Sequence, residues 1–233
     1  DQDMSLVTAR RVVRFIFESP SSELTVQLRG GEPLLNWEVL EFIVRHLRSF
    51  AASVRRRLRI GLVSNLNALD EPRMAFLAEN EVELCAALDG PAALHDAGRG
   101  PAGGGAHAAT VRALAAWTAR HPASPRPEAF LTVTRAVLGH AAEILEEYRR
   151  LGLSGLRVRP LLPSGSARTG WAARGLSPEE YLGFYDDLLG RALAADAEAA
   201  PFIERGAAEL LSRVLTDEDA GLDYQDPSES RFS

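Results

Sequence analysis

The 233-residue chain is long enough for one domain with a sizeable core, and 46% of its residues are hydrophobic. Its formal net charge of -6 leaves no basic footprint for nucleic acid, and its single cysteine excludes a disulfide framework. Neither an apolar run of membrane-spanning length nor a signal-peptide pattern is present. We therefore expect a cytoplasmic protein with neither nucleic-acid nor membrane partners.

Helices and strands are predicted to alternate along most of the chain. Ser5 is the predicted N-cap of a first helix over residues 5–18, and Asn36 and Asp70 are the predicted caps of the second and third helices. Residues 98–105 are predicted to be a flexible loop. Later helices are predicted at 108–119, 141–151, 177–195 and 202–215, and strands at 24–28, 59–63, 82–88, 129–134 and 156–161.

Strands that are separated by helices indicate an α/β fold with a parallel sheet and right-handed crossovers. After residue 162 this alternation stops, because the last two helices follow each other with no predicted strand between them. Periodicity alone does not distinguish a doubly wound sheet from a barrel. In a barrel, ligands bind at the C-terminal ends of the strands.

A glycine pair stands where the first predicted strand ends, in the run RGGEPLLN that begins at Arg29. Gly30 and Gly31 lack Cβ atoms, so the backbone there can approach a ligand closely. Glu32 adds an anionic acceptor, and Pro33 stiffens the exit from the turn. The alternative interpretation is a strand-to-helix turn that simply needs glycine.

Two more strand ends carry polar residues in a matching order. Val63-Ser64-Asn65 ends the second strand, and Leu88-Asp89-Gly90-Pro91 ends the third, before His95-Asp96 and Arg99. This series resembles the radical SAM enzymes with a SPASM-type C-terminal extension, whose patterns run GGEPLL, TNG, then SLDGP followed by HD and Arg. Segments further along the chain look most like the His-Xaa-Ser system radical SAM maturases. These segments are Leu131–Thr134, Glu143–Gly152, Leu156–Leu161, Ser164–Gly165, Pro178–Tyr181, Phe184–Tyr185, Ala208–Leu211 and Asp223–Pro227.

The resemblance implies a fold and a domain organisation. The expected fold is a partial (β/α)6 radical SAM barrel with strands 2 to 6 present and extra C-terminal helices. Residues 1–175 would form this core, and residues 176–233 would be a helical linker towards a missing SPASM-type extension. We interpret the polypeptide as the middle part of such an enzyme.

The resemblance also implies a binding site for S-adenosyl-L-methionine (SAM). Gly30, Gly31 and Glu32, followed by Pro33, would contact the SAM amino group, and an ammonium does need carbonyl or carboxylate acceptors. Ser64 and Asn65 stand where the family has TNG, which implies a position near the SAM methionine or ribose. Leu66 replaces the usual glycine there, so the backbone geometry is in question.

Asp89 matches the SLDGP pattern, and Arg99 could reach an anionic group of SAM or of a peptide. Ala87 replaces a serine that commonly meets the ribose, so one hydrogen bond worth about 1 kcal/mol is missing. His95-Asp96 is interpreted as a local pair that orders the loop. At the end of the last predicted strand, Arg159 is expected to bind a substrate carboxylate.

Family members hold a 4Fe-4S cluster through a CxxxCxxC loop that this sequence lacks. Cys85 cannot supply three thiolates, so we expect no metal site and no cluster in this fragment. The five histidines show no zinc spacing either.

By resemblance, the intact enzyme would cleave SAM to a 5'-deoxyadenosyl radical that modifies a peptide or small-protein substrate, and this fragment would be inactive alone. The alternatives are an anaerobic sulfatase-maturing type enzyme, or a cluster-free remnant that only binds a partner peptide or nucleotide.

Overall fold

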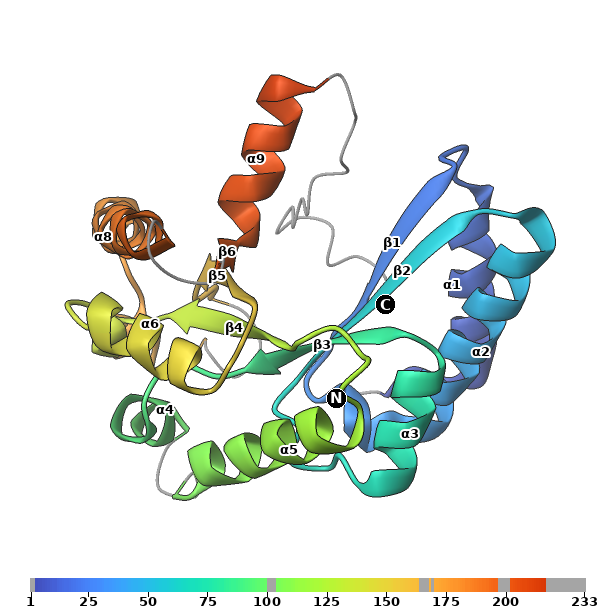
Figure 1. The fold of residues 1–233 in the computed structure, drawn as a ribbon, viewed down its shortest axis with the longest axis horizontal. Coiled ribbons are helices and arrows are strands. Elements are labelled where there is room, and N and C mark those ends of the chain that lie inside the picture. Colours follow the sequence, from blue (N-terminus) through green and yellow to red (C-terminus); the bar gives the residue numbers. More distant parts are fainter. Residues whose placement is uncertain (1–2, 100–103, 164–167, 169, 197–201, 217–233) are drawn as a thin grey trace.

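A six-stranded parallel sheet forms the centre of the protein, with its strands in chain order (Figure 1). The structure is a computed structural model, and it describes residues 3–99, 104–163, 168, 170–196 and 202–216. The strands are β1 (Glu23–Leu28), β2 (Arg57–Ser64), β3 (Val82–Ala87), β4 (Glu128–Val133), β5 (Gly155–Pro160) and β6 (Ile203–Glu204).

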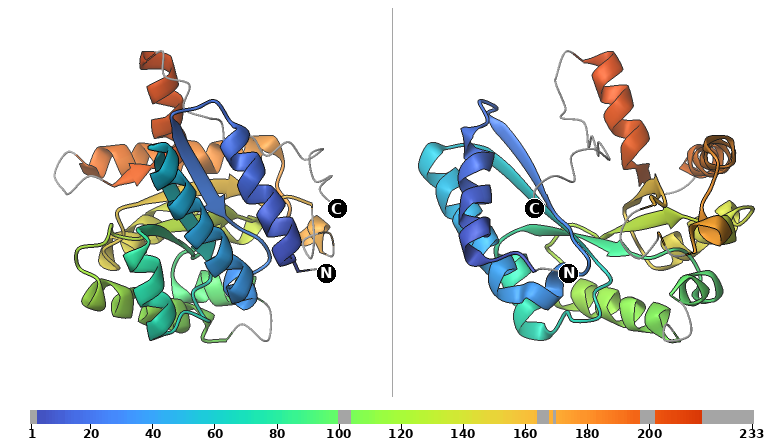
Figure 2. Two further views of the ribbon diagram at one scale, coloured as in Figure 1. Left: turned by 90° about the vertical axis from the view of Figure 1, so that its right-hand side faces the viewer. Right: turned by 180° about the vertical axis from the view of Figure 1, so that it is seen from behind.

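The sheet is curved, and the helices that connect its strands lie on the outer, convex side, whereas α9 stands on the open side (Figures 1 and 2). The helices are α1 (Leu6–Glu18), α2 (Trp37–Val54), α3 (Glu71–Glu79), α4 (Ala92–Gly98), α5 (Ala106–Arg120), α6 (Ala141–Arg150), α7 (Trp171–Arg174), α8 (Pro178–Asp196) and α9 (Arg205–Leu215), with the 3-10 turns η1 (Pro33–Asn36) and η3 (Arg135–Val137). This half-barrel confirms the predicted α/β fold, a partial radical SAM barrel with extra helices.

One of the strands and two of the α-helices were not predicted. The last helix was expected to begin at residue 202, but Ile203–Glu204 form β6, which pairs in parallel with Gly155–Leu156 of β5. Gly155 permits this pairing, because a Cβ atom at that position would collide with the Ile203 carbonyl. The short helices α4 and α7 were also missed, since seven and four residues give too little periodicity to recognise.

Two of the three predicted helix caps are confirmed. Ser5 Oγ accepts a hydrogen bond from Thr8 N, and the Asp70 carboxylate accepts one from Arg73 N at 3.0 Å. Asn36 precedes α2, but its side chain does not cap the helix and instead donates to the Met4 carbonyl at 3.0 Å. The prediction of a side-chain cap at this position was therefore wrong: η1 leads directly into α2 there.

The hydrophobic core lies between the convex face of the sheet and the helices that cover it. Alternate strand residues such as Ile60, Leu62 and Leu131 are fully buried there, as a half-buried parallel sheet requires. Their sequence neighbours Gly61 and Thr132 point to the concave face. That face is consequently available for polar groups.

Some predicted features fall outside the described residues. They include residues 100–103 of the predicted loop, the Ser164–Gly165 and Asp223–Pro227 segments, and residues 217–233 of the predicted linker. Within the described helices, no segment combines the length and hydropathy needed to cross a membrane.

Candidate functional site

The Glu32 carboxylate joins the ends of the first two strands. Its Oε1 accepts from Ser64 Oγ at 2.6 Å and from Leu34 N at 3.1 Å, and its Oε2 accepts from Asn65 N at 2.9 Å. A carboxylate offers about four acceptor positions, so one remains for a further donor. The predicted convergence of Glu32 with Ser64 and Asn65 is therefore confirmed.

The backbone of Gly30 and Gly31 is open. A Cβ atom built on either residue would meet no atom within 4 Å, and neither glycine has a left-handed φ. Contacts within the described protein therefore do not require glycine at these two positions. The open backbone lies directly beside the Glu32 carboxylate.

Asn65 is held mainly through its backbone. Its carbonyl accepts a hydrogen bond from Thr110 Oγ1 at 2.9 Å, while its side-chain Oδ1 accepts from Asn67 N at 2.9 Å. Leu66, where the resemblance leads one to expect glycine, adopts a left-handed backbone conformation with φ of 61° although its side chain is buried. The chain thus keeps at Leu66 a backbone conformation that glycine favours. Thr110, a fully buried residue of α5, was not singled out from the sequence.

Asp89 and Arg99 lie together at the end of β3. Asp89 Oδ1 accepts from Thr132 N at 3.1 Å, and its Oδ2 lies 3.6 Å from Arg99 Nη2. Arg99 Nη2 also donates to the Ala87 carbonyl at 3.0 Å. His95, only 1% exposed, accepts from Asp89 N through Nδ1. These contacts fix the Asp89 carboxylate at the same edge of the sheet as Glu32.

The Asp96 carboxylate binds the backbone at the N-terminal end of α5. It accepts from His107 N at 2.8 Å and Gly105 N at 3.2 Å, and these bonds lower the pKa of Asp96. His107 Nε2 in turn lies 2.8 Å from Glu147 Oε1. Hydrogen bonds from Arg150, with His107 adding to them, hold the pKa of Glu147 below its usual range despite burial. This cluster stabilises α5 and α6 rather than lining the strand ends.

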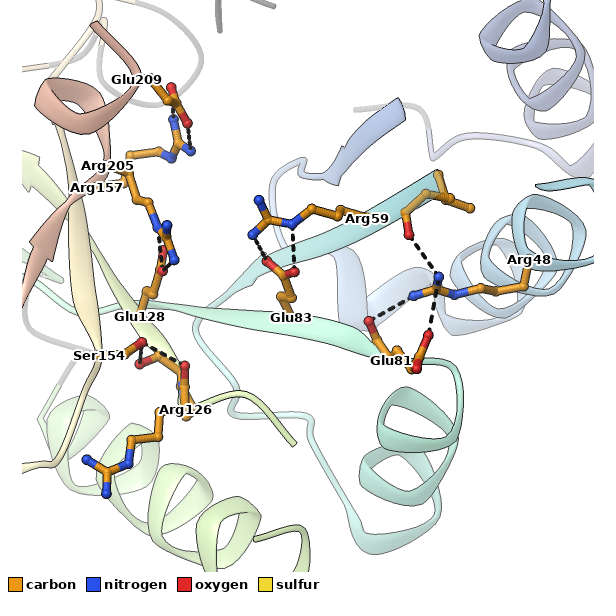
Figure 3. Close-up of polar contacts among 12 residues, drawn as sticks. Arg48, Arg59, Glu81, Glu83, Arg126, Glu128, Ser154, Arg157, Arg205 and Glu209 are labelled. Carbon is orange, nitrogen blue, oxygen red and sulfur yellow. Dashed lines mark hydrogen bonds and ion pairs between the residues drawn. The ribbon is translucent and has the colours of Figure 1, made fainter. Parts of the chain in front are cut away.

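Ion pairs cross the concave side of the sheet (Figure 3). Two of them reach α9 from the sheet, and the third joins neighbouring strands. The three pairs are Arg59 Nε to Glu83 Oε1 at 2.9 Å, Arg205 Nε to Glu128 Oε1 at 2.6 Å, and Arg157 Nη2 to Glu209 Oε1 at 2.7 Å. Arg59 and Glu83 lie in the N-terminal halves of their strands, and Glu128 begins β4. Three pairs of opposite charges therefore lie on the concave side of the sheet.

Arg159 faces the concave side, at the position in β5 that pairs with Thr132 of β4. Its guanidinium carbon lies 4.8 Å from the centre of the Phe130 ring, and so does that of Arg29. Arg159, which was predicted to bind substrate, therefore lies against the same ring as Arg29, the residue that directly precedes Gly30. Neither Phe130 nor Arg29 was recognised from the sequence as part of a site, although the adjacency of Arg29 to the glycine pair was a usable signal.

No cluster site is found in the part of the chain that the structure describes, where no group of three or more His, Cys, Asp or Glu side chains could hold a metal ion. Cys85 is 7% exposed within β3, and burial raises the pKa of its thiol to about 12. This residue does not fit the role of an iron ligand, which must be a thiolate.

No protein-family model matches the sequence, and a search of curated proteins found no significant match. Among solved structures, the protein is similar to native anSMEcpe with bound AdoMet (that is, SAM) and Kp18Cys peptide, with a TM-score of 0.73, 18% identity, and coverage of 94% of this chain and 60% of that one. It is also similar to Streptococcus suis SuiB bound to precursor peptide SuiA, with a TM-score of 0.61, 9% identity, and coverage of 87% and 42%. The chain therefore spans about 60% of the length of anSMEcpe. At these identities the shared property is the fold, which is that of a partial radical SAM barrel.

Proposed function

We propose that this chain is the SAM-binding core of a radical SAM enzyme that modifies a peptide. The observation that carries the proposal is the open Gly30–Gly31 backbone beside a Glu32 carboxylate that is tied to Ser64 and Asn65. A Cβ atom added to either glycine would meet no atom within 4 Å apart from its chain neighbours. A similarly folded protein was solved with AdoMet and a peptide, which supports the choice of ligand.

The strand-end residues have distinct proposed roles. Glu32 retains one acceptor position, and together with the carbonyls of Gly30 and Gly31 it would bind the SAM ammonium. Pro33 stiffens the turn that presents these groups. The Ser64–Asn65 backbone would border the methionine or ribose, and Asp89 and Arg99 would close the opposite side of the site.

The 4Fe-4S cluster does not fit the residues of this sequence, because Cys85 is its only cysteine and is buried. The ligands of a cluster would have to come from residues beyond this sequence, and the chain alone is expected to be inactive. SAM, when bound beside such a cluster, supplies the radical chemistry of the enzymes that the sequence resembles. This chain's part is to orient SAM and the substrate and to exclude water from them.

A peptide is the proposed substrate, because the similar proteins were solved with peptides and the concave face is lined by polar groups. The finer assignment to the His-Xaa-Ser system maturases rests on the downstream motifs, and the proposed cytoplasmic location rests on the composition of the sequence. A cluster-free module that binds a partner peptide or nucleotide is the second candidate, and the lone buried Cys85 favours it.

Replacement of Gly31 by alanine tests the SAM site without disturbing the fold. The added methyl group meets no protein atom within 4 Å, so the melting temperature should not change. It would occupy the space proposed for SAM, so SAM affinity, measured by ligand-observed NMR, should fall at least about tenfold, or about 1.4 kcal/mol. Gly183→Ala is the matched control, because Gly183 is equally open but lies on α8.

The proposal fails if Gly31→Ala binds SAM as well as the unchanged chain does. It also fails if the Gly183→Ala control weakens SAM binding to the same extent. Undiminished binding of a partner peptide by a chain that does not bind SAM would favour the cluster-free module.

A further inference from the structure

We propose that two buried side chains, those of His95 and Tyr148, position the Asp89 carboxylate in the proposed SAM site. They do so by holding the peptide unit that precedes Asp89. The inference rests on the proposed function, since Asp89 is one of the residues proposed to bind SAM. This peptide unit lies beyond Ala87, where β3 ends, so its N–H and C=O need partners from outside the sheet.

Each end of this peptide unit has one buried side-chain partner. The Asp89 N–H donates to His95 Nδ1 at 3.1 Å, and the Leu88 carbonyl accepts a hydrogen bond from the Tyr148 hydroxyl. His95 is 1% exposed, and Tyr148 is fully buried. Burial raises the pKa of Tyr148 well above its usual range, so the hydroxyl remains a donor. Because the N–H and C=O of one peptide unit lie in one plane, the two bonds fix its orientation.

The bond to the Asp89 N–H requires one form of the His95 ring. Nδ1 can accept only while it carries no proton, so His95 is neutral and its proton is on Nε2. The Asp89 carboxylate does not replace the N–H as the partner of the ring, because its Oδ2 lies 3.6 Å from Nδ1, beyond hydrogen-bond distance. His95 therefore serves Asp89 as an acceptor and not as a positive charge.

The turn after Asp89 and the start of α4 place His95 within reach. Gly90 has a left-handed φ of 103°, and a Cβ atom there would lie 2.8 Å from the Ile144 side chain, so the turn requires glycine. His95 N then donates to the Pro91 carbonyl at 3.0 Å as the helix begins. The His95 ring thereby returns to a backbone N–H six residues before it in the sequence.

Helix α5 supports the His95 ring. The His107 ring lies edge-on to it, with the two ring centres 6.1 Å apart. Asp96 follows His95 and accepts from His107 N at 2.8 Å, which ties α4 to α5. His107 is held in turn by Glu147, whose Oε1 lies 2.8 Å from its Nε2. The ring is thus fixed by packing and hydrogen bonds, as a residue that positions another must be.

The two oxygens of Asp89 then have different roles. Oδ1 accepts from Thr132 N at 3.1 Å, which continues the pairing with β4 past the end of β3. Oδ2 lies 3.6 Å from Arg99 Nη2, and it makes no hydrogen bond to any residue that the structure describes. Oδ2 is therefore the oxygen that remains to accept a hydrogen bond from SAM. A shift of the peptide unit would displace it.

The test uses two substitutions with side chains of the same shape. His95→Asn keeps an acceptor oxygen in place of Nδ1, whereas His95→Leu puts a methyl group there. SAM affinity, measured by ligand-observed NMR on the full chain, should fall at least about tenfold in His95→Leu, or about 1.4 kcal/mol, and stay within about threefold in His95→Asn. A role in packing alone would favour leucine, which suits a buried position better. His46→Leu, at an exposed position on α2, is the control and should not change SAM affinity.

A second readout needs no SAM. Hydrogen exchange followed by NMR should show that the Asp89 and Thr132 amides lose protection in His95→Leu and keep it in His95→Asn, because the carboxylate that binds Thr132 moves with the peptide unit. Tyr148→Phe, which removes the other hydrogen bond of this unit, should cause the same loss. Nitrogen NMR of the unchanged chain should show an unprotonated Nδ1 at His95.

Two results would overturn the inference. One is a measurable SAM affinity that is equal in His95→Asn and His95→Leu, and the other is a Thr132 amide that stays protected in His95→Leu. If the unchanged chain does not bind SAM but the amides respond as expected, the proposed function fails and the positioning of Asp89 stands. If Gly31→Ala weakens SAM binding and neither His95 variant does, the SAM site stands and the inference fails. Thermal melting shows that each variant is folded, and Tyr148→Phe provides the same test if His95→Leu is not.

Discussion

The Ser64 hydroxyl donates a 2.6 Å hydrogen bond to the Glu32 carboxylate and accepts one of 2.9 Å from the Leu66 backbone N–H. One buried hydroxyl therefore links the end of β1 to the turn that follows β2. The same contact holds Glu32 in place and supports the left-handed residue at position 66. Residues proposed to bind a ligand here also stabilise the fold.

Replacement of Ser64 by alanine should lower the free energy of unfolding by about 1 to 3 kcal/mol, because the buried Leu66 N–H loses its acceptor and Glu32 loses a donor. Urea unfolding measures this change. Ser53→Ala is the control, since Ser53 is exposed on α2 and bonds only to the Phe50 carbonyl. Equal stabilities of the two variants would contradict the structural role of Ser64.

At position 66, glycine should be less destabilising than alanine, whereas in a helix alanine is the more stable of the two. Both Leu66→Ala and Leu66→Gly remove a buried side chain. Alanine still has a Cβ atom, which makes the left-handed backbone at φ of 61° unfavourable, whereas glycine has none. Leu66→Gly should therefore be more stable than Leu66→Ala by about 1 kcal/mol. The two midpoints in urea provide the comparison, and a more stable alanine variant would contradict the assigned conformation.

The Cys85 thiol should be unreactive in the folded protein. Burial raises its pKa to about 12, so almost no thiolate exists at pH 8. Ellman's reagent should label it only after denaturant is added. Rapid labelling of the native chain would show that β3 opens.

Anaerobic reconstitution with iron and sulfide should leave the chain without a stoichiometric cluster, because one buried cysteine cannot replace three thiolates. Iron analysis and the visible absorption spectrum provide the measurement. About four irons per chain together with SAM cleavage would overturn the assignment of the cluster ligands to residues beyond this sequence.

Glu147 should make stability depend on pH. Its folded-state pKa is lowered, chiefly by the Arg150 hydrogen bonds, so its contribution is present above the ordinary glutamate range and is lost as pH falls through the folded-state value. Between about pH 6 and 3, Glu147→Gln should therefore lose less stability than the unchanged chain does. Denaturant unfolding across this range measures how the free energy of unfolding of each protein changes with pH. Glu146→Gln, at an exposed neighbouring position, should retain the original slope.

The fold was largely predictable, because long elements carry clear patterns. Helix α1 shows a strong apolar stripe and a Ser5 cap, and β2 ends in a recognisable polar pair. By contrast, β6 has two residues, and its pairing depends on Gly155 of β5, which the residues around Ile203 do not reveal. Short elements are defined by their tertiary partners rather than by local sequence.

The strand-end site was partly predictable for a geometric reason. Parallel strands place their C-terminal ends at one edge, so Glu32, Ser64 and Asn65 had to converge. The stacking of Arg29 and Arg159 on Phe130 could not be predicted, because it depends on the curvature that brings β1 towards β4. The contact of Thr110 with the Asn65 carbonyl likewise depends on how α5 packs.

The attachment of α9 has a consequence for the order of folding. Its ion pairs join Arg205 to Glu128 and Glu209 to Arg157, over separations of 77 and 52 residues. Closing such long loops costs more conformational entropy than pairing adjacent strands, so we expect the sheet to form before α9 docks. On the ribosome, Arg157 of β5 and Glu128 of β4 would meet their partners on α9 only after α9 has emerged. Until then the concave face of a newly made chain would lack both of these long-range ion pairs.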